Sequence, residues 1–209
     1  MQQDLLPLFP LQAVLFPRTP LPLHIFEERY KEMMREVLDK GAEFGVVQAA
    51  EKGIANMGCT AAVRQVLHRY PDGRLDLLTV GQRRFEILSL DDEGSFLRGA
   101  VEYFDDDVFD PVEMTVRQRA LDQYRELADL SEPPAFQNPE FADPQLSFQL
   151  AQIVPDLEFR QELLASRSEA ARMESIAKFL EDWVPRHRRT LHARSVAPLN
   201  GHGKHSESL

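Results

Sequence analysis

Residues 21–30 read LPLHIFEERY and contain the change from strand to helix on which the fold prediction rests. Before this stretch, residues 4–26 alternate short apolar runs with prolines, and since proline cannot donate to a β-ladder this predicts short, edge-type strands. After it, apolar residues recur at three-four spacing and predict an amphipathic helix that ends at Gly41. The residues on that helical face are Tyr30, Met33, Met34, Val37 and Leu38.

The rest of the first half has the pattern of an antiparallel β-meander. Strands are expected over residues 44–49, 59–70, 75–80, 84–90 and 96–104. The sequence Pro71-Asp72-Gly73-Arg74 between two of them has the proline and glycine of a hairpin turn. Residues 1–110 are therefore expected to form an antiparallel sheet curled into a barrel, with one helix inserted early.

The strand pattern stops at the acidic run 105–107 and Asp110-Pro111, and helices are expected beyond it. They are predicted over residues 112–130, 145–154, 156–165 and 168–183, with Pro185 ending the last one and a proline-rich connector over 131–144. The expected fold class is α+β: a β-barrel over 1–110, a helical bundle over 111–185 and a disordered tail over 186–209.

Composition disfavours several classes of function. The net charge of −10 argues against nucleic-acid binding, because phosphate contacts need a basic surface. Cys59 is the single cysteine, so that no internal disulfide can form and a reducing compartment fits. No apolar run is long enough to span a membrane, and no secretory signal begins the sequence. A cytoplasmic protein that does not contact membranes is expected.

No set of residues has the spacing of a known catalytic site. The sequence contains no phosphate-binding loop and no Gly-x-Ser-x-Gly elbow, and no lysine has the context of a serine-lysine dyad. No metal site and no cofactor are expected. One enzymatic alternative stays open, a hydrolase that uses His24, Glu27 and Cys59. The competing interpretation is structural: His24 packs at the strand-helix junction, and Glu27 stabilises the positive end of the helix.

The order of the motifs resembles the LON substrate-binding family, the N-terminal domain of Lon proteases, which is also similar to the Lon-like domain of cereblon. The motifs that carry the resemblance are PLFPL at 7–11, VLFP at 14–17, LPLHIFEERY at 21–30, FGVV at 44–47, GCTA at 58–61, PDGR at 71–74, GQRRF at 81–85 and RQELL at 160–164. The sequence departs from the pattern at Arg18, where relatives often have glycine. The resemblance implies a PUA-like β-barrel followed by a small helical bundle.

The resemblance also implies a function. In Lon proteases an ATPase and a serine-lysine peptidase follow this domain, and these parts are not expected here. The expected function is therefore non-catalytic binding of unfolded or degron-bearing polypeptide, as an adaptor that passes clients to a protease or chaperone. The alternative from the fold alone is an RNA-binding PUA-like module.

The candidate peptide-binding residues come from the motifs and from the connector. The motif residues are His24, Phe26, Arg29, Tyr30, Arg84 and Phe85, and the connector residues are Phe136 and Phe141. Each group has a structural alternative. Motif residues can determine the fold, with Arg29 and Arg84 paired to carboxylates, and the two phenylalanines can dock on their own domain.

Overall fold

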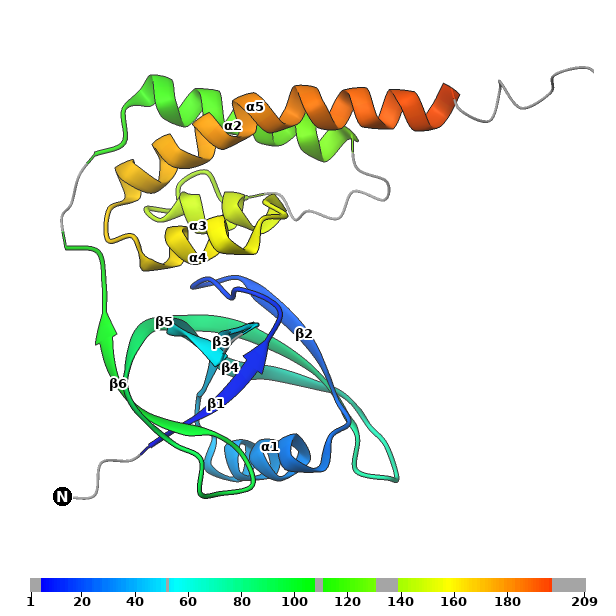
Figure 1. Cartoon of the computed structure of the whole chain (residues 1–209), viewed down its shortest axis with the longest axis vertical. Coiled ribbons are helices and arrows are strands. Elements are labelled where there is room, and N and C mark those ends of the chain that lie inside the picture. The colour runs from blue at the N-terminus through cyan, green and yellow to red at the C-terminus, as the bar shows by residue number, and fades with distance from the viewer. Residues whose placement is uncertain (1–4, 52, 108–110, 131–138, 197–209) are drawn as a thin grey trace, which may run out of the picture. The chain divides into compact units, whose positions relative to one another are not determined.

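The computed structural model describes residues 5–51, 53–107, 111–130 and 139–196 (Figure 1). The strands and first helix are β1 (Leu6–Leu11), β2 (Pro20–Ile25), α1 (Glu28–Lys40), β3 (Phe44–Ala50), β4 (Gly53–Arg69), β5 (Leu75–Asp91) and β6 (Arg98–Phe104). The later helices are α2 (Met114–Leu130), α3 (Leu146–Leu150), the 3-10 turn η1 (Ala151–Ile153), α4 (Leu157–Ala165) and α5 (Glu169–Val196). The α+β class expected from the sequence is confirmed.

The six strands form one mixed sheet in the order β2-β5-β4-β3-β1-β6, and β6 also pairs with β5. The pairing thus runs from β5 through β4, β3, β1 and β6 and returns to β5. The expected all-antiparallel arrangement is wrong at one place, because β1 pairs with β3 in parallel, with Leu8 opposite Gly45. A parallel pair needs a crossover connection, which β2 and α1 provide, and strand alternation in the sequence does not reveal that direction.

The long strand β5 was expected as two strands, over residues 75–80 and 84–90. It is continuous through residues 81–83 because its first part pairs with β2 and its second part with β6. Gly81, within this continuous strand, lies close to another segment of the backbone. A Cβ atom there would lie 2.1 Å from the carbonyl oxygen of Phe16. The glycine therefore allows the loop between β1 and β2 to pack directly against β5.

Helix α1 confirms the amphipathic helix expected from residue spacing. Four residues of its apolar face, Tyr30, Met33, Met34 and Val37, are buried. Gly41 has φ 59° and ends the helix in the left-handed conformation, as expected of a C-cap glycine. Burying four such side chains contributes roughly 1.5–3 kcal/mol each, so packing on the sheet is the main reason that this segment is helical.

The chain divides into two compact units, with one division after residue 110, and it returns to the first unit at residue 139. The first unit contains residues 1–110 and 139–169, and the second contains residues 111–138 and 170–209. Helix α4 belongs with the sheet because its side chains bond to sheet residues and loops. Arg160 Nη2 donates to the Val14 carbonyl at 2.7 Å, and Gln161 Nε2 donates to the Met57 carbonyl at 2.9 Å.

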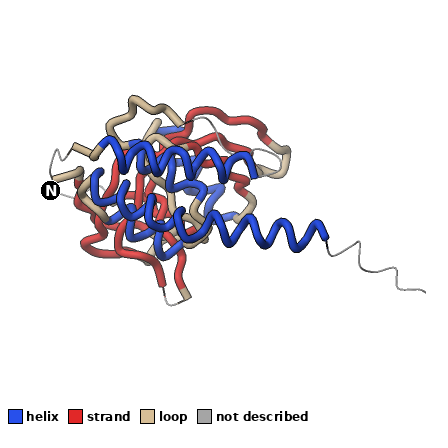
Figure 2. Tube along the Cα trace, turned by 90° about the horizontal axis from the view of Figure 1, so that it is seen from above, coloured by secondary structure: helices blue, strands red, loops and turns tan. Residues whose placement is uncertain are grey.

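The second unit consists of α2 and α5, which lie side by side in both views (Figures 1 and 2). Arg119 of α2 pairs with Glu174 of α5 at 3.1 Å, and Arg188 pairs with Glu126. The prediction that Pro185 ends the last helix is wrong, because α5 continues to Val196. Residues 186–196, expected in a disordered tail, are thus helical, and residues 197–209 lie outside the described part of the chain.

Contacts on both sides of Pro185 explain why the helix continues. The indole ring of Trp183 stacks on the imidazole of His187, with centroids 4.5 Å apart. Arg189 Nε donates to the Pro185 carbonyl at 3.2 Å, and Thr190 Oγ1 donates to the Arg186 carbonyl at 3.1 Å. The proline still removes one helical N–H donor.

Over the described ranges, no helix has the length and apolar character to cross a membrane.

Candidate functional site

A groove of about 380 Å³ lies between β1, β2 and the start of α1. It is lined by residues 9–11, residues 22–27, Arg29 and Tyr30, and we call it the β1–β2 groove. Four of the eight candidate residues line it: His24, Phe26, Arg29 and Tyr30. The motif at residues 21–30 thus brings the end of a strand and the first turn of a helix to one surface.

The floor of the β1–β2 groove is aromatic. Phe9 and Tyr30 are 5% and 8% exposed, and their rings meet edge to face with centroids 4.4 Å apart. Phe26 is 59% exposed, and its ring stacks on the His24 imidazole at 5.9 Å. Since large exposed apolar side chains often mark interaction sites when they adjoin a hollow, Phe26 distinguishes this groove.

The polar side chains of the β1–β2 groove are held by neighbours. Arg29 donates to Glu27 Oε2 from Nε at 3.0 Å and lies 2.8 Å from it through Nη2, while its guanidinium lies 4.5 Å from the Tyr30 ring centroid. His24 Nδ1 lies 2.6 Å from Asp76 Oδ1, and this hydrogen bond lowers the pKa of Asp76. Arg29 therefore does pair with a carboxylate, although this pair is at the surface.

Prolines explain why β1 and β2 do not pair. In β2 the residues that alternate with Pro20 and Pro22 bond to β5, so that the two prolines face away from it. In β1 the Leu8 N–H donates to Leu97 on the side away from β3, and Pro10 faces the same way by alternation. Pro10 and Pro22 have no N–H, and among the described strands no ladder joins β1 to β2.

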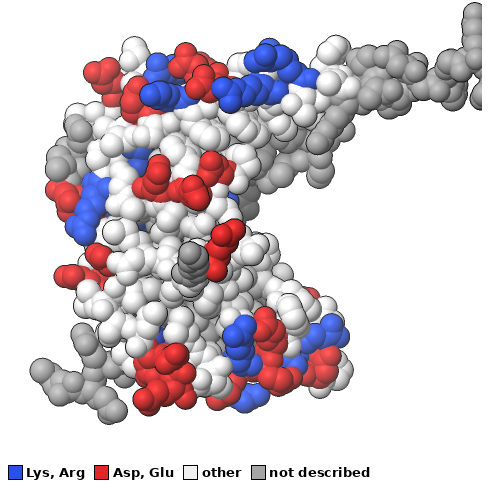
Figure 3. Space-filling view, in the orientation of Figure 1, with Lys and Arg blue, Asp and Glu red and all other residues white. Residues whose placement is uncertain are grey.

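A second hollow of about 280 Å³ continues the β1–β2 groove toward the turn between β5 and β6. It shares Pro10, Arg29 and Tyr30 with the groove and adds Asp92 and Phe96, among others. The two hollows together form one surface on which an extended segment can lie. Figure 3 shows acidic and basic side chains interspersed over α1 on the face drawn there.

The structure buries two of the candidate residues, Arg84 and Phe85. Arg84 is 2% exposed, and it donates to the carbonyls of Leu164 and Ser166 and to Asp106 Oδ1 at 2.7 Å. Phe85 is fully buried in the core. Neither side chain is accessible to a ligand, because adjacent residues point to opposite faces of β5 and both faces are covered here. Their place in the motif is explained by the fold.

Neither connector residue is found in the β1–β2 groove of the described structure. Phe136 lies outside the described residues. Phe141 is 44% exposed in a turn of the first unit and does not line the groove.

The arrangement of His24, Glu27 and Cys59 does not support the hydrolase alternative. Cys59 is fully buried, and burial raises the pKa of its thiol to about 12, so that a thiolate is not available near neutral pH. His24 and Glu27 are held by Asp76 and Arg29 instead. Within the described ranges no cluster of three potential metal ligands is present.

Arg18, the departure from the family pattern, has φ 60°, the left-handed conformation that glycine adopts freely. Its side chain lies 2.5 Å from Asp143 Oδ1 and donates to Gln145 Oε1 at 3.1 Å. These contacts join the loop between β1 and β2 to the segment before α3. They offset the strain that a side chain imposes at this position.

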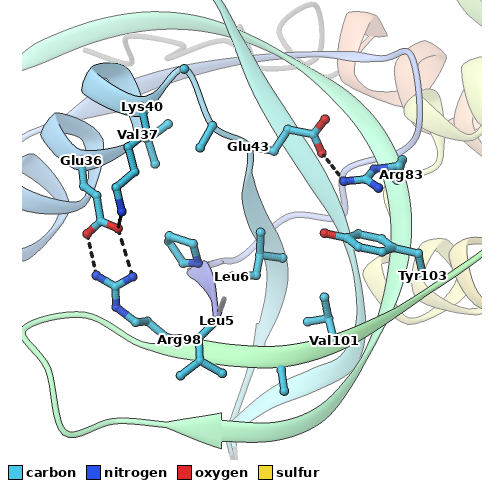
Figure 4. A pocket seen from close by; sticks show the side chains of 14 residues that line it. Leu5, Leu6, Glu36, Val37, Lys40, Glu43, Arg83, Arg98, Val101 and Tyr103 are labelled. Carbon is cyan, nitrogen blue, oxygen red and sulfur yellow. Dashed lines mark hydrogen bonds and ion pairs between the residues drawn. The ribbon is translucent and has the colours of Figure 1, made fainter. Parts of the chain in front are cut away.

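A larger pocket of about 520 Å³ lies elsewhere in the first unit, between the start of β1, the end of α1 and β6 (Figure 4). Its charged residues pair with one another: Glu36 with Arg98 and Lys40, and Glu43 with Arg83. None of the eight candidate residues lines it. The β1–β2 groove is therefore the better candidate, since the candidate residues and an exposed aromatic ring meet there.

Comparison with solved structures gives the same fold for domains of Lon proteins. The Lon N-terminal domain protein from Xanthomonas campestris has a TM-score of 0.67 and 26% identity, and the match covers 83% of this chain and 96% of that chain. The N-terminal domain of the Mycobacterium avium complex Lon protease has a TM-score of 0.60 at 14% identity, covering 87% and 98%. The second likeness shows the fold alone.

Sequence comparison gives the family. The Lon protease of Parabacteroides distasonis is 30% identical over 112 residues, which are 49% of this chain and 14% of that protease. The family model for the ATP-dependent protease La (LON) substrate-binding domain matches residues 5–182. The chain is a member of the LON substrate-binding domain family.

Proposed function

We propose that the chain binds unfolded or degron-bearing polypeptide in the β1–β2 groove, without processing it. The observation that carries the proposal is Phe26, which is 59% exposed beside the aromatic floor of the groove. Family membership supports substrate binding in general. An extended apolar segment could place side chains on Phe9, Phe26 and Tyr30. This would bury the apolar surface that Phe26 exposes to water.

The proposed biological role is that of an adaptor for protein quality control in the cytoplasm. Clients held in the β1–β2 groove would pass to a protease or chaperone, a role that the likeness to Lon domains supports. The return of the strand pairing to β5 supports assigning the sheet as the PUA-like barrel of this family. Phe141 is an additional candidate contact because it is also exposed.

The proposal is tested by a Phe26→Ala variant and a matched control. Leu88→Ala is the control, because Leu88 is 58% exposed on β5 and does not line the groove. Binding of reduced, carboxymethylated α-lactalbumin, which stays unfolded, is measured by fluorescence anisotropy. We expect Phe26→Ala to weaken binding about tenfold, the cost of losing a central aromatic contact, and Leu88→Ala to leave it unchanged. Equal effects of the two substitutions, or no binding by the unsubstituted chain, would overturn the proposal.

A further inference from the structure

Several polar groups of the residues that line the β1–β2 groove are hydrogen-bond acceptors. Pro10 and Pro22 line the groove, and each has a carbonyl oxygen but no N–H. Both contacts that Arg29 makes with Glu27 end on Oε2, so that Oε1 can accept from a ligand. The N–H of His24, two residues after Pro22 in β2, faces away from β5 as that proline does and is a backbone donor.

Some of the donors on the groove side chains are directed at carboxylates of the chain itself. Arg29 bonds to Glu27 and covers the face of Tyr30, and the His24 ring bonds to Asp76. A ligand rich in N–H donors would meet carbonyl and carboxylate oxygens.

The charges along the groove point the same way. Glu27 and Asp92 line the two connected hollows, with Arg29 between them, which leaves one net negative charge. Asp91 and Glu93 lie next to Asp92 in the chain, within a Debye length of about 10 Å. Cations also bind favourably to aromatic faces such as that of the exposed Phe26.

We infer that the β1–β2 groove selects extended segments that combine apolar or aromatic side chains with lysine or arginine. This inference rests on the proposed function and adds the class of client. The apolar side chains would occupy the aromatic floor, while the basic side chains reach Glu27 and Asp92. Acidic apolar segments are disfavoured because their carboxylates meet the like charge of Glu27 and Asp92.

The test uses the full chain and three fluorescein-labelled twelve-residue peptides. The peptides alternate leucine and phenylalanine with lysine, with glutamine or with glutamate, so that only charge differs. Anisotropy gives the dissociation constants at low and moderate salt. We expect the lysine peptide to bind about fivefold more tightly than the glutamine peptide, which corresponds to one or two exposed ion pairs, and the glutamate peptide to bind most weakly.

Two double variants separate the groove from the overall charge of −10, which by itself attracts a basic peptide. Glu27→Gln with Asp92→Asn changes the groove, and Asp39→Asn with Glu102→Gln makes the same charge change at exposed positions that line neither hollow. We expect the first pair to abolish most of the preference for lysine and the second to retain it. Circular dichroism and thermal melting check that both variants are folded.

The outcomes distinguish this inference from the function on which it rests. If the lysine and glutamate peptides bind equally well, or if the two double variants lose the preference equally, the client class is wrong while polypeptide binding stands. If the glutamate peptide binds best, the inferred charge selection is contradicted. If no peptide binds at all, the proposed function fails and the inference fails with it.

Discussion

Arg83 and Arg84 are adjacent in the chain, but their side chains have different surroundings. Arg83 is exposed, and it reaches Glu43 at 3.4 Å and lies 3.9 Å from the Tyr103 ring centroid. Arg84 is buried and bonds to two carbonyls and to Asp106. Removing a buried arginine leaves its acceptors without donors, whereas an exposed pair contributes little in water.

We therefore predict a large difference between two alanine substitutions. Arg84→Ala is expected to lower the free energy of unfolding by about 3 kcal/mol or more, and Arg83→Ala by less than about 1 kcal/mol. Urea denaturation followed by circular dichroism measures both. If the two variants are equally stable, Arg84 does not have the structural role assigned to it.

Two phenylalanines show where prediction from the sequence stops at the residue scale. Phe26 and Phe85 both belong to conspicuous motifs, yet one is 59% exposed and the other fully buried. The sequence predicts that each lies in or beside a strand. It does not predict which face of the strand is covered, because that depends on distant segments that pack on the sheet.

Among the secondary-structure elements, α1 and β6 are joined by an ion-pair cluster (Figure 4). Arg98 of β6 donates to both carboxylate oxygens of Glu36, at 3.2 and 2.6 Å, and Lys40 donates to the same carboxylate at 3.0 Å. These hydrogen bonds lower the pKa of Glu36 from 4.5 to about 2. Those from Arg98 have the largest effect, and the one from Lys40 has the next largest. The cluster therefore favours the charged form of Glu36 in the folded state.

This cluster gives a pH dependence of stability. Because the folded pKa of Glu36 lies below its unfolded value, the contribution is complete above about pH 4.5 and is lost as pH falls toward 2. We expect Glu36→Gln to lower stability by about 2 kcal/mol near neutral pH, after allowing for solvent screening, and by much less near pH 2. Urea titrations of both proteins across this range measure the difference, and a constant difference would contradict the assignment.

Helix α5 contains Pro185 well inside its bounds. The proline cannot donate a helical N–H bond, and its ring crowds the preceding turn. Pro185→Ala is therefore expected to stabilise the helix by about 1–3 kcal/mol. Hydrogen exchange of residues 186–193 should slow relative to the unsubstituted chain. Faster or unchanged exchange would show that these residues do not continue α5.

Elements that depend on nearby residues could be predicted from the sequence, and elements that depend on distant segments could not. Helix α1 and the turn at 71–74 follow from residue spacing and glycine placement, and both are as expected. The parallel pairing of β1 with β3 and the continuity of β5 are set by distant segments. The continuation of α5 past Pro185 depends on contacts such as the pairing of Arg188 with Glu126 of α2.

For the molecule as a whole, the division into two units separates the sheet from the long helices. The first unit contains the sheet, α1, α3 and α4, and with them every residue of the β1–β2 groove. The second contains α2 and α5. The sequence predicted a boundary near residue 110, but it did not predict that the chain returns to the first unit after residue 139.

The candidate site was predictable in part at this scale. The family motif located His24, Phe26, Arg29 and Tyr30, which the structure brings to one groove. Phe9 and Pro10 were not among the candidates, although they form the opposite side. The prolines indicated edge strands, but only the tertiary structure shows that two such edges face one groove.

The most direct test of the central claim is to map where an unfolded polypeptide contacts the full chain. A peptide with alternating apolar and basic residues, carrying a photoreactive phenylalanine analogue, is cross-linked to the protein, and the sites are identified by mass spectrometry. Binding in the β1–β2 groove predicts cross-links at residues 9–11 and 22–30. Cross-links concentrated on Tyr103 and its neighbours in the larger pocket, or on α2 and α5, with none in the groove, would contradict it.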